Sequence, residues 1–115
     1  MSSPKYGEVW LVTFPFSDLT STKLRPALVI SVHREDVIIL GIFSKIPTAG
    51  LRETWVLMPE NHPKFLQTGL KKISLIRANK IATIHELVFQ KRLGVLPSDI
   101  LILVQKALQK ALNIS

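Results

Sequence analysis

An arginine followed at once by a proline, Arg25-Pro26, is the best candidate for chemistry in this sequence. It closes a polar stretch over residues 16–25 and precedes an apolar run, so a loop should deliver the arginine at the entry of a strand. A guanidinium is planar and always charged, and it can hold a phosphate through two hydrogen bonds. On this pattern alone, an ordinary loop arginine remains the simpler interpretation.

The other polar residues give little support to metal or cofactor chemistry. His33, His62 and His85 have no partners at ligand-like spacing, so we expect structural or solvent-exposed roles for them. The glycines are scattered singly, which argues against a phosphate-binding glycine loop, and the sequence has no cysteine. Only three Asp and five Glu are present, which argues against a two-carboxylate magnesium nuclease. We therefore expect no metal, no cofactor, and a site of Arg, Ser or Thr and His.

The charge balance favours a polyanionic partner. Fifteen Lys and Arg against eight Asp and Glu give a formal net charge of +7 on 115 residues. Such an excess suits nucleic acid, an acidic protein or an anionic membrane surface. The basic residues are spread along the chain, so a folded surface must gather them. A merely soluble basic protein remains an equal alternative on charge alone.

Residues of strand-forming type recur in short segments along most of the chain. Alternating aromatic and β-branched residues, bounded by proline and turn residues, predict the strands. We expect strands at Glu8–Phe14, Pro26–Val32, Val37–Phe43, Glu53–Met58, Lys71–Arg77, Lys80–Ile84 and, with a bend, Leu87–Leu96. The segment 64–67 is compatible with one helical turn.

The last segment has helical spacing instead. Ser98 is a candidate N-cap, Asp99 suits the first turn, and the lysines lie late in the helix, where its dipole favours them. The predicted inward face consists of Ile100, Leu103, Val104, Ala107, Leu108, Ala111 and Leu112. The sequence thus predicts a mainly β fold, a small and strongly bent barrel with a C-terminal α-helix, in one domain over residues 1–115.

The expected compartment follows from two features of the sequence. The longest apolar run, Val37–Phe43, has seven residues, whereas a membrane-spanning helix needs about 20. The first eight residues have no apolar signal core and already contain a carboxylate. We expect a cytoplasmic protein that does not bind membranes.

Two motifs in order give the chain a resemblance to a known family. The segment 6–15, Tyr-Gly-Glu-Val-Trp-Leu-Val-Thr-Phe-Pro, and then Arg25–Ser31, Arg-Pro-Ala-Leu-Val-Ile-Ser, resemble the opening of the PemK/MazF toxins. The stretches Ile42–Ile46, Ser74–Ile84 and Lys91–Leu96 fit the later family segments more loosely and in the right order. The first motif is fairly specific, and the resemblance covers nearly the whole chain.

This resemblance implies a fold, an activity and partners. It implies a bent SH3-like β-barrel, a homodimer that binds single-stranded RNA along its interface, and a cognate antitoxin that blocks the groove. It also implies a metal-independent, sequence-selective endoribonuclease of a type II toxin-antitoxin module. In such enzymes the ribose 2′-hydroxyl attacks the adjacent phosphorus, which leaves a cyclic phosphate and a 5′-hydroxyl. Because the substrate supplies the nucleophile, the protein needs only proton transfer and charge stabilisation.

The same resemblance assigns the site residues. Arg25 matches the catalytic arginine, which stabilises phosphorane charge, with protonation of the leaving oxygen as a further role. Ser44 matches the serine of a Thr-Ser pair that hydrogen-bonds the phosphate. The implied RNA-binding residues are Lys23, Lys45, Arg77, Phe43, Thr83 and His85.

Phe43 and several later residues depart from the family pattern. Phe43 occupies the threonine position of the Thr-Ser pair, and a phenyl ring cannot hydrogen-bond a phosphate. We expect the ring to turn into the core; stacking on an unpaired base is the alternative. Ala82 and His85 replace an arginine and an aspartate that some members have, and Asn79 replaces an aspartate. These departures bear on cleavage efficiency.

Two other functions stay open on the sequence. A catalytically weak module that binds RNA or an antitoxin agrees with Phe43 and with the Ala82 and His85 departures. A toxin of the same fold that acts on a DNA topoisomerase, as the related CcdB proteins do, is the third hypothesis. The basic charge and Arg25-Pro26 argue against the topoisomerase hypothesis.

Overall fold

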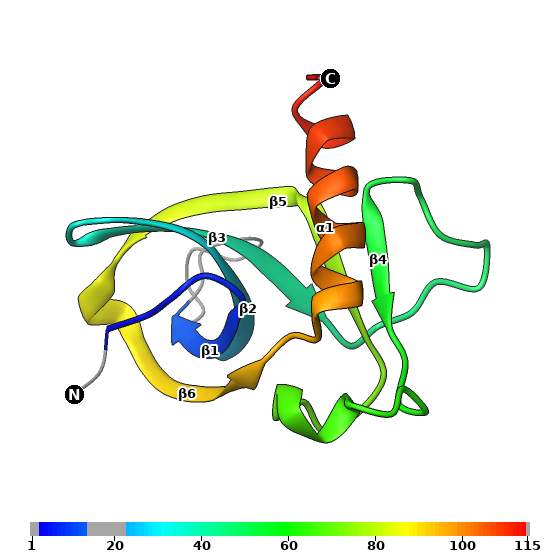
Figure 1. Cartoon of the computed structure of the whole chain (residues 1–115), viewed down its shortest axis with the longest axis horizontal. Helices are drawn as coiled ribbons and strands as arrows, with labels where there is room; N and C mark the ends of the chain where they lie inside the picture. Colours follow the sequence, from blue (N-terminus) through cyan, green and yellow to red (C-terminus); the bar gives the residue numbers. More distant parts are fainter. Residues whose placement is uncertain (1–2, 14–22, 115) are drawn as a thin grey trace.

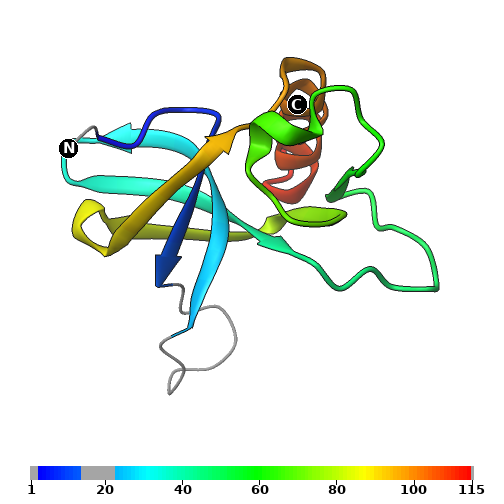
Figure 2. The same cartoon turned by 90° about the horizontal axis from the view of Figure 1, so that it is seen from below.

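A computed structural model describes residues 3–13 and 23–114 of the chain. These residues form a strongly bent antiparallel sheet with one long helix packed beside it (Figures 1 and 2). In chain order the elements are β1 (Glu8–Thr13), β2 (Leu24–His33), β3 (Asp36–Phe43), β4 (Trp55–Met58), η1 (Phe65–Thr68), β5 (Ser74–His85), η2 (Glu86–Val88), β6 (Phe89–Val95) and α1 (Ser98–Ala111). The mainly β class and the C-terminal helix predicted from the sequence are confirmed.

The sheet is bent like a barrel but stays open. Its strand order is β4-β5-β3-β2-β1-β6, and every pairing is antiparallel. The two edge strands, β4 and β6, do not pair, and η1 packs against β6 at this side of the sheet. The bent barrel expected from the sequence is thus open, in backbone hydrogen bonding, between these two edge strands.

Alternation along the strands builds two hydrophobic clusters, one on each face of the bent sheet. Trp10 and Val12 of β1 pack with Ala27, Val29, Val37, Ile39 and Phe89 in one cluster. Val9, one residue earlier, belongs to the other cluster, which includes the buried helix residues Ile100, Val104 and Ala107. Successive side chains of a strand point to opposite faces, so β1 contributes to both. This explains why the central strands are apolar at nearly every position.

The fifth and sixth strands of the sequence prediction are one strand. β5 runs without a break from Ser74 to His85 and pairs with β3 along its length. The register changes between Gly41, which pairs with Arg77, and Leu40, which pairs with Ile81. Residues 78–80 form the extra segment, and the Ala78 N–H donates to the Thr54 carbonyl instead. The break that the sequence predicts, between a strand ending at Arg77 and another beginning at Lys80, is this bulge.

The N-cap of the helix lies one residue earlier than predicted. Pro97 is the N-cap and Ser98 the first helical residue, and no side chain caps the N-terminus. Asp99 does lie in the first turn, where its Oδ2 lies 2.8 Å from His62 Nε2, and this hydrogen bond lowers the pKa of Asp99. Of the predicted inward face, Leu103 and Leu112 are each 49% exposed rather than buried.

The beginnings of the first strands also differ from the prediction. β2 already includes Leu24 and Arg25, so Arg25 belongs to the strand and not to the preceding loop. Phe14 and most of the predicted polar loop lie outside the described residues. The predicted bent strand at 87–96 is the short helix η2 followed by β6, and the fourth strand begins at Trp55.

A carboxylate near the chain start ties three segments together. Glu8 Oε2 accepts a hydrogen bond from Arg92 Nε, at 2.6 Å, while Oε1 accepts from Trp10 Nε1 and from the Lys5 N–H. Burial raises the pKa of Glu8, but these hydrogen bonds outweigh it and hold the pKa below its usual value. The acidic residue of the first motif thus has a structural role.

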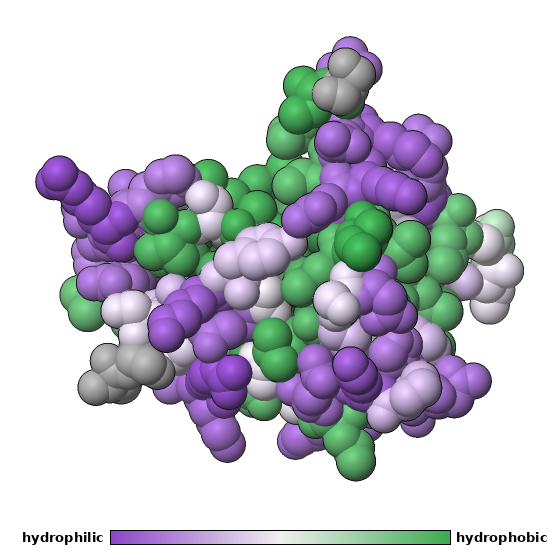
Figure 3. All heavy atoms as spheres, in the orientation of Figure 1, coloured by the Kyte–Doolittle hydropathy of each residue, from purple (hydrophilic) through white to green (hydrophobic). Residues whose placement is uncertain are grey.

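The surface is mixed in character. On the face seen in Figure 3, hydrophilic and hydrophobic side chains are interspersed, and hydrophobic ones reach the surface near the C-terminal end of α1. Leu112 and Ile114 account for exposed apolar surface there. Within the described part of the chain, no helix is long and apolar enough to cross a bilayer.

Candidate functional site

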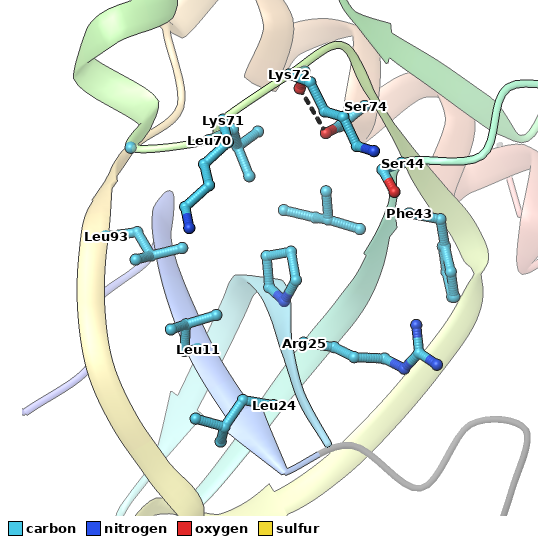
Figure 4. A pocket seen from close by; sticks show the side chains of 13 residues that line it. Leu11, Leu24, Arg25, Phe43, Ser44, Leu70, Lys71, Lys72, Ser74 and Leu93 are labelled. Carbon is cyan, nitrogen blue, oxygen red and sulfur yellow. Dashed lines mark hydrogen bonds between the residues drawn. The ribbon is translucent and has the colours of Figure 1, made fainter.

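One cavity of about 320 Å³ is lined by Arg25, Phe43 and Ser44, three of the residues that the sequence singles out. Its walls come from the start of β2, the end of β3, and the segment between η1 and β5, with β1 and β6 contributing apolar side chains (Figure 4). The lining residues are Leu11, Leu24, Arg25, Pro26, Ile42, Phe43, Ser44, Gly69, Leu70, Lys71, Lys72, Ser74 and Leu93. Apolar side chains and three basic side chains thus share the lining of the cavity.

Arg25 is held in this cavity by strand pairing on one side. It pairs with Val12 of β1, and Pro26, which cannot donate a hydrogen bond, follows in the same strand. The pairing of β2 with β3 ends at Ala27 and Gly41, and both Arg25 and Phe43, two residues beyond this pair on their strands, line the cavity. Figure 4 shows the guanidinium extending toward the Phe43 ring. Arg25 is therefore positioned by strand β2 itself and not by the preceding loop that the sequence predicts.

Ser44 is the first residue after β3 and is exposed. It lines the same cavity as Arg25, so the two residues that the family resemblance makes catalytic are brought to one cavity. A guanidinium and a hydroxyl are both hydrogen-bond donors to phosphate oxygens. The end of the pairing between β3 and β5, at Phe43 and Leu75, leaves Ser44 outside the sheet.

The expectation that Phe43 turns into the core is wrong. The residue is half-buried, belongs to neither hydrophobic cluster, and lines the cavity. Its ring centre lies 4.6 Å from the guanidinium carbon of Arg77. The physical reason is that β5 presents a cation beside the end of β3, and the face of an aromatic ring attracts a cation.

Arg77 is enclosed by a second aromatic ring as well. Its guanidinium carbon also lies 4.6 Å from the Trp55 ring centre, and Trp55 pairs with it across β4 and β5. Arg52 approaches the same indole at 5.2 Å, and the indole N–H donates to Asn79 Oδ1 at 3.2 Å. Arg77 Nε is buried and has no hydrogen-bond partner among the described residues. The arrangement fixes the guanidinium plane and leaves a donor unsatisfied.

The two lysines predicted to bind RNA lie next to the site rather than in it. Lys45 follows Ser44 and is exposed, and Lys23 directly precedes β2 and is also exposed. Neither lines the cavity. Both occupy positions from which long side chains can contact a polyanion that enters the cavity.

Thr83 and His85 are not brought to the cavity. They pair with Ile38 and Asp36, on the far side of the β5 bulge from Arg77, near the turn between β2 and β3. His85 Nδ1 accepts a hydrogen bond from the Leu87 N–H and caps η2. If one RNA chain reaches both places, it must follow β5 along its length.

Sequence reasoning missed two lysines that line the cavity and a tryptophan that contacts the neighbouring Arg77. Trp55 appeared only as a strand residue, and Lys71 and Lys72 only as part of the spread basic charge. A signal for the lysines exists, since two adjacent cations follow a glycine between a helical turn and a strand. Nothing in the sequence shows that this segment lines the same cavity as Arg25, because the two are far apart in the chain.

The described lining residues of the cavity supply three cations and no carboxylate. Such a site attracts anions, and it can stabilise the charge that develops on a phosphate during transfer. Among the described residues, no three His, Asp or Glu side chains gather in a metal-binding group. The chemistry that these side chains can perform is hydrogen bonding and charge stabilisation at a phosphate.

Comparison with known sequence families decides the family. Residues 5–112 match the family described as the PemK-like, MazF-like toxin of the type II toxin-antitoxin system. The chain belongs to the PemK/MazF family. The match includes the first motif, all six strands and the whole of α1, so the family resemblance inferred from the sequence is confirmed.

Solved structures share the fold of this PemK/MazF chain at low sequence identity. An endoribonuclease from a mycobacterial species is 24% identical, with a TM-score of 0.72 over 99% of this chain and 95% of the other. A mycobacterial endoribonuclease in complex with its cognate antitoxin is 22% identical, with a TM-score of 0.74 over 98% of both chains. A MazE–MazF complex from Deinococcus radiodurans is 20% identical, with a TM-score of 0.71 over the full length of both. A search of curated protein sequences finds no match.

Proposed function

We propose that this PemK/MazF chain is the toxin of a type II toxin-antitoxin module and a metal-independent, sequence-selective endoribonuclease that cuts single-stranded RNA. The observation that carries the proposal is the cavity that joins Arg25 and Ser44 at the ends of β2 and β3. The whole chain, residues 1–115, would act as one domain. Similar structures described as endoribonucleases add support through the shared fold.

The proposed reaction needs only what this cavity offers. The ribose 2′-hydroxyl forms a bond to the adjacent phosphorus, and the bond from phosphorus to the 5′-oxygen breaks. The hydroxyl loses a proton, the leaving oxygen gains one, and a 2′,3′-cyclic phosphate remains. Arg25 stabilises the added negative charge, and Ser44 donates a hydrogen bond to a phosphate oxygen. Single strands are the expected substrate because their base edges and 2′-hydroxyls are accessible.

Two protein partners belong to the proposal. A cognate antitoxin is supported by the similar structures that contain one. We also propose a homodimer, with the RNA bound along its interface, and a cytoplasmic location where mRNA is available. Sedimentation at micromolar concentration tests the dimer, and a strict monomer would contradict it.

The activity is tested by an arginine exchange with a matched control. Arg25→Gln removes a cation from the cavity, and Arg34→Gln removes one from the turn between β2 and β3, at the other end of these strands. Loss of one charge-stabilising donor lowers a rate by about 10²–10³. We expect that loss for Arg25→Gln with single-stranded RNA in EDTA, and near wild-type cleavage for Arg34→Gln. Equal activity of both variants would place the site elsewhere.

A binding module without strong catalysis is the second candidate. It is favoured by Phe43, whose ring faces Arg77 where a hydroxyl would otherwise be available. In that case wild-type protein would bind single-stranded RNA or the antitoxin but release no cyclic phosphate. The EDTA assay above separates the two functions, because only the enzyme gives a rate that depends on Arg25.

A further inference from the structure

Two lysines from a segment outside the predicted site line the same cavity as Arg25 and Ser44, and Figure 4 shows both of them across the cavity from Arg25. Lys71 and Lys72 lie between η1 and β5, and both line the cavity. In Figure 4, Lys72 extends its ammonium toward the side of Ser44, and Lys71 extends toward Leu93. The two cations therefore approach from the wall opposite β2.

The segment that carries these lysines is anchored firmly at its first end. Thr68 is fully buried, and its hydroxyl donates to the Phe65 carbonyl and accepts from the Leu70 N–H. Gly69 has a φ of +73°, and a Cβ there would collide with the Leu93 carbonyl oxygen of β6. In β6 itself, a Cβ at Gly94 would collide with the backbone of the η1 segment. Close backbone contact with β6 thus sets where the segment passes.

The second end is anchored as well. The Ser74 hydroxyl donates to the Lys72 carbonyl at 2.9 Å, and Ser74 is only 4% exposed. The Ile73 N–H donates to Glu60 Oε1, also at 2.9 Å. Both lysines therefore start from a fixed backbone, while their side chains remain exposed to solvent. A fixed backbone lowers the entropy cost of holding a ligand.

We propose that Lys71 and Lys72 form a phosphate-binding subsite for RNA, opposite Arg25. This inference rests on the proposed function and adds the residues that hold the RNA backbone in the cavity. Lysine binds phosphate as a compact point charge with three donors, so it tolerates several backbone directions. The described lining offers no carboxylate to neutralise either ammonium. Arg25 and Ser44 hold the reacting phosphate, and the two lysines hold the neighbouring RNA backbone, Lys72 beside Ser44 and Lys71 on the side of Leu93.

The test measures how RNA affinity depends on salt. The probe is a mixed-sequence single-stranded RNA whose 2′-hydroxyls carry methyl groups, which removes the nucleophile and prevents cleavage. Removing one lysine–phosphate ion pair lowers the slope of log affinity against log salt by about 0.7. The double variant Lys71→Gln/Lys72→Gln should reduce that slope by about 1.4, so a fourfold rise in salt weakens wild type about sevenfold more than the double variant. The control is Lys64→Gln, an exposed lysine beside η1 that does not line the cavity.

The outcomes separate this inference from the proposed function. A reduced slope in the double variant, with the wild-type slope in Lys64→Gln, supports the subsite. The variant Lys71→Arg/Lys72→Arg keeps both charges and should show the wild-type slope. A wild-type slope in the double variant overturns the subsite, even if the lysines then prove to bind carboxylates of a protein partner. Failure of wild type itself to bind or cleave single-stranded RNA overturns the proposed function instead. Circular dichroism checks that each variant is folded.

Discussion

The guanidinium carbon of Arg77 lies 4.6 Å from the ring centre of Phe43, and Phe43 is the residue that departs from the family pattern. The Trp55 ring encloses the same guanidinium at 4.6 Å, so the cation is held between two aromatic rings. A phenyl ring at this position therefore does not simply remove a hydroxyl from the site. It fixes a second cation beside the cavity that contains Arg25 and Ser44.

The first prediction concerns the energy of this contact. A double-mutant cycle of Phe43→Leu and Arg77→Met should give a coupling of about 0.5–2 kcal/mol in the free energy of unfolding, because the charge over the ring is partly shielded from water. Denaturation in urea measures it. The control cycle combines Leu66→Ala with Arg77→Met. Leu66 is 91% exposed, so this cycle should give no coupling. Zero coupling for Phe43 would show that the two side chains are merely adjacent.

The second prediction concerns threonine at position 43. Because Phe43 is half-buried and outside both clusters, Phe43→Thr should fold, with a decrease of about 1–2 kcal/mol in the free energy of unfolding. The new hydroxyl can donate to a phosphate next to Ser44, so RNA cleavage should be at least as fast as in wild type. Thermal unfolding and a single-turnover assay measure the two effects. An unfolded Phe43→Thr would restore the interpretation of Phe43 as a core residue.

The position of Phe43 shows where sequence reasoning ends. Period-two alternation correctly predicts β1, apolar runs predict β2 and β3, and helical spacing predicts α1, since burial on one or both faces leaves a direct mark on composition. Strand pairing between distant segments leaves no such mark. The meeting of Phe43, Trp55 and Arg77 depends on the pairing of β5 with β3 and β4. The position of Lys71 and Lys72 depends on the close contact of their segment with β6. The sequence likewise predicts a strand end at the bulge of residues 78–80, because the pairing of β5 with β3 on both sides of it is not visible in the sequence.

The third prediction tests the close approach that positions the lysines. Gly69→Ala places a methyl group where a backbone oxygen already lies, at a positive φ, and should destabilise the protein strongly. Gly50→Ala is the matched control, because Gly50 has a φ of +98° but no atom within 4 Å of the place that a Cβ would occupy. Both variants cost about 1–2 kcal/mol for the left-handed backbone, and Gly69→Ala costs about 1–3 kcal/mol more for overpacking. Equal melting temperatures would mean that the segment can move away from β6.

The fourth prediction is a pH dependence that originates at Glu8. Its pKa is lowered in the folded protein, so its stabilising contribution is present above the unfolded value of 4.5 and is lost as the pH falls through the lower folded pKa. Glu8→Gln should remove about 1–3 kcal/mol from the free energy of unfolding at neutral pH, through the weakened bonds to Arg92 and Trp10. It should also flatten the fall in stability below pH 4.5. The control is Glu35→Gln in the exposed turn; the same flattening there would remove the special role of Glu8.

The cavity of Arg25 and Ser44 is proposed to cut RNA by attack of the 2′-hydroxyl. The most direct measurement is mass spectrometry of the products formed from a single-stranded RNA in EDTA, with Arg25→Gln run in parallel. We predict fragments that end in a 2′,3′-cyclic phosphate and fragments that begin with a 5′-hydroxyl, formed by wild type and about 10²–10³ times more slowly by the variant. Products with 5′-phosphate ends, or equal rates for the two proteins, would contradict this mechanism.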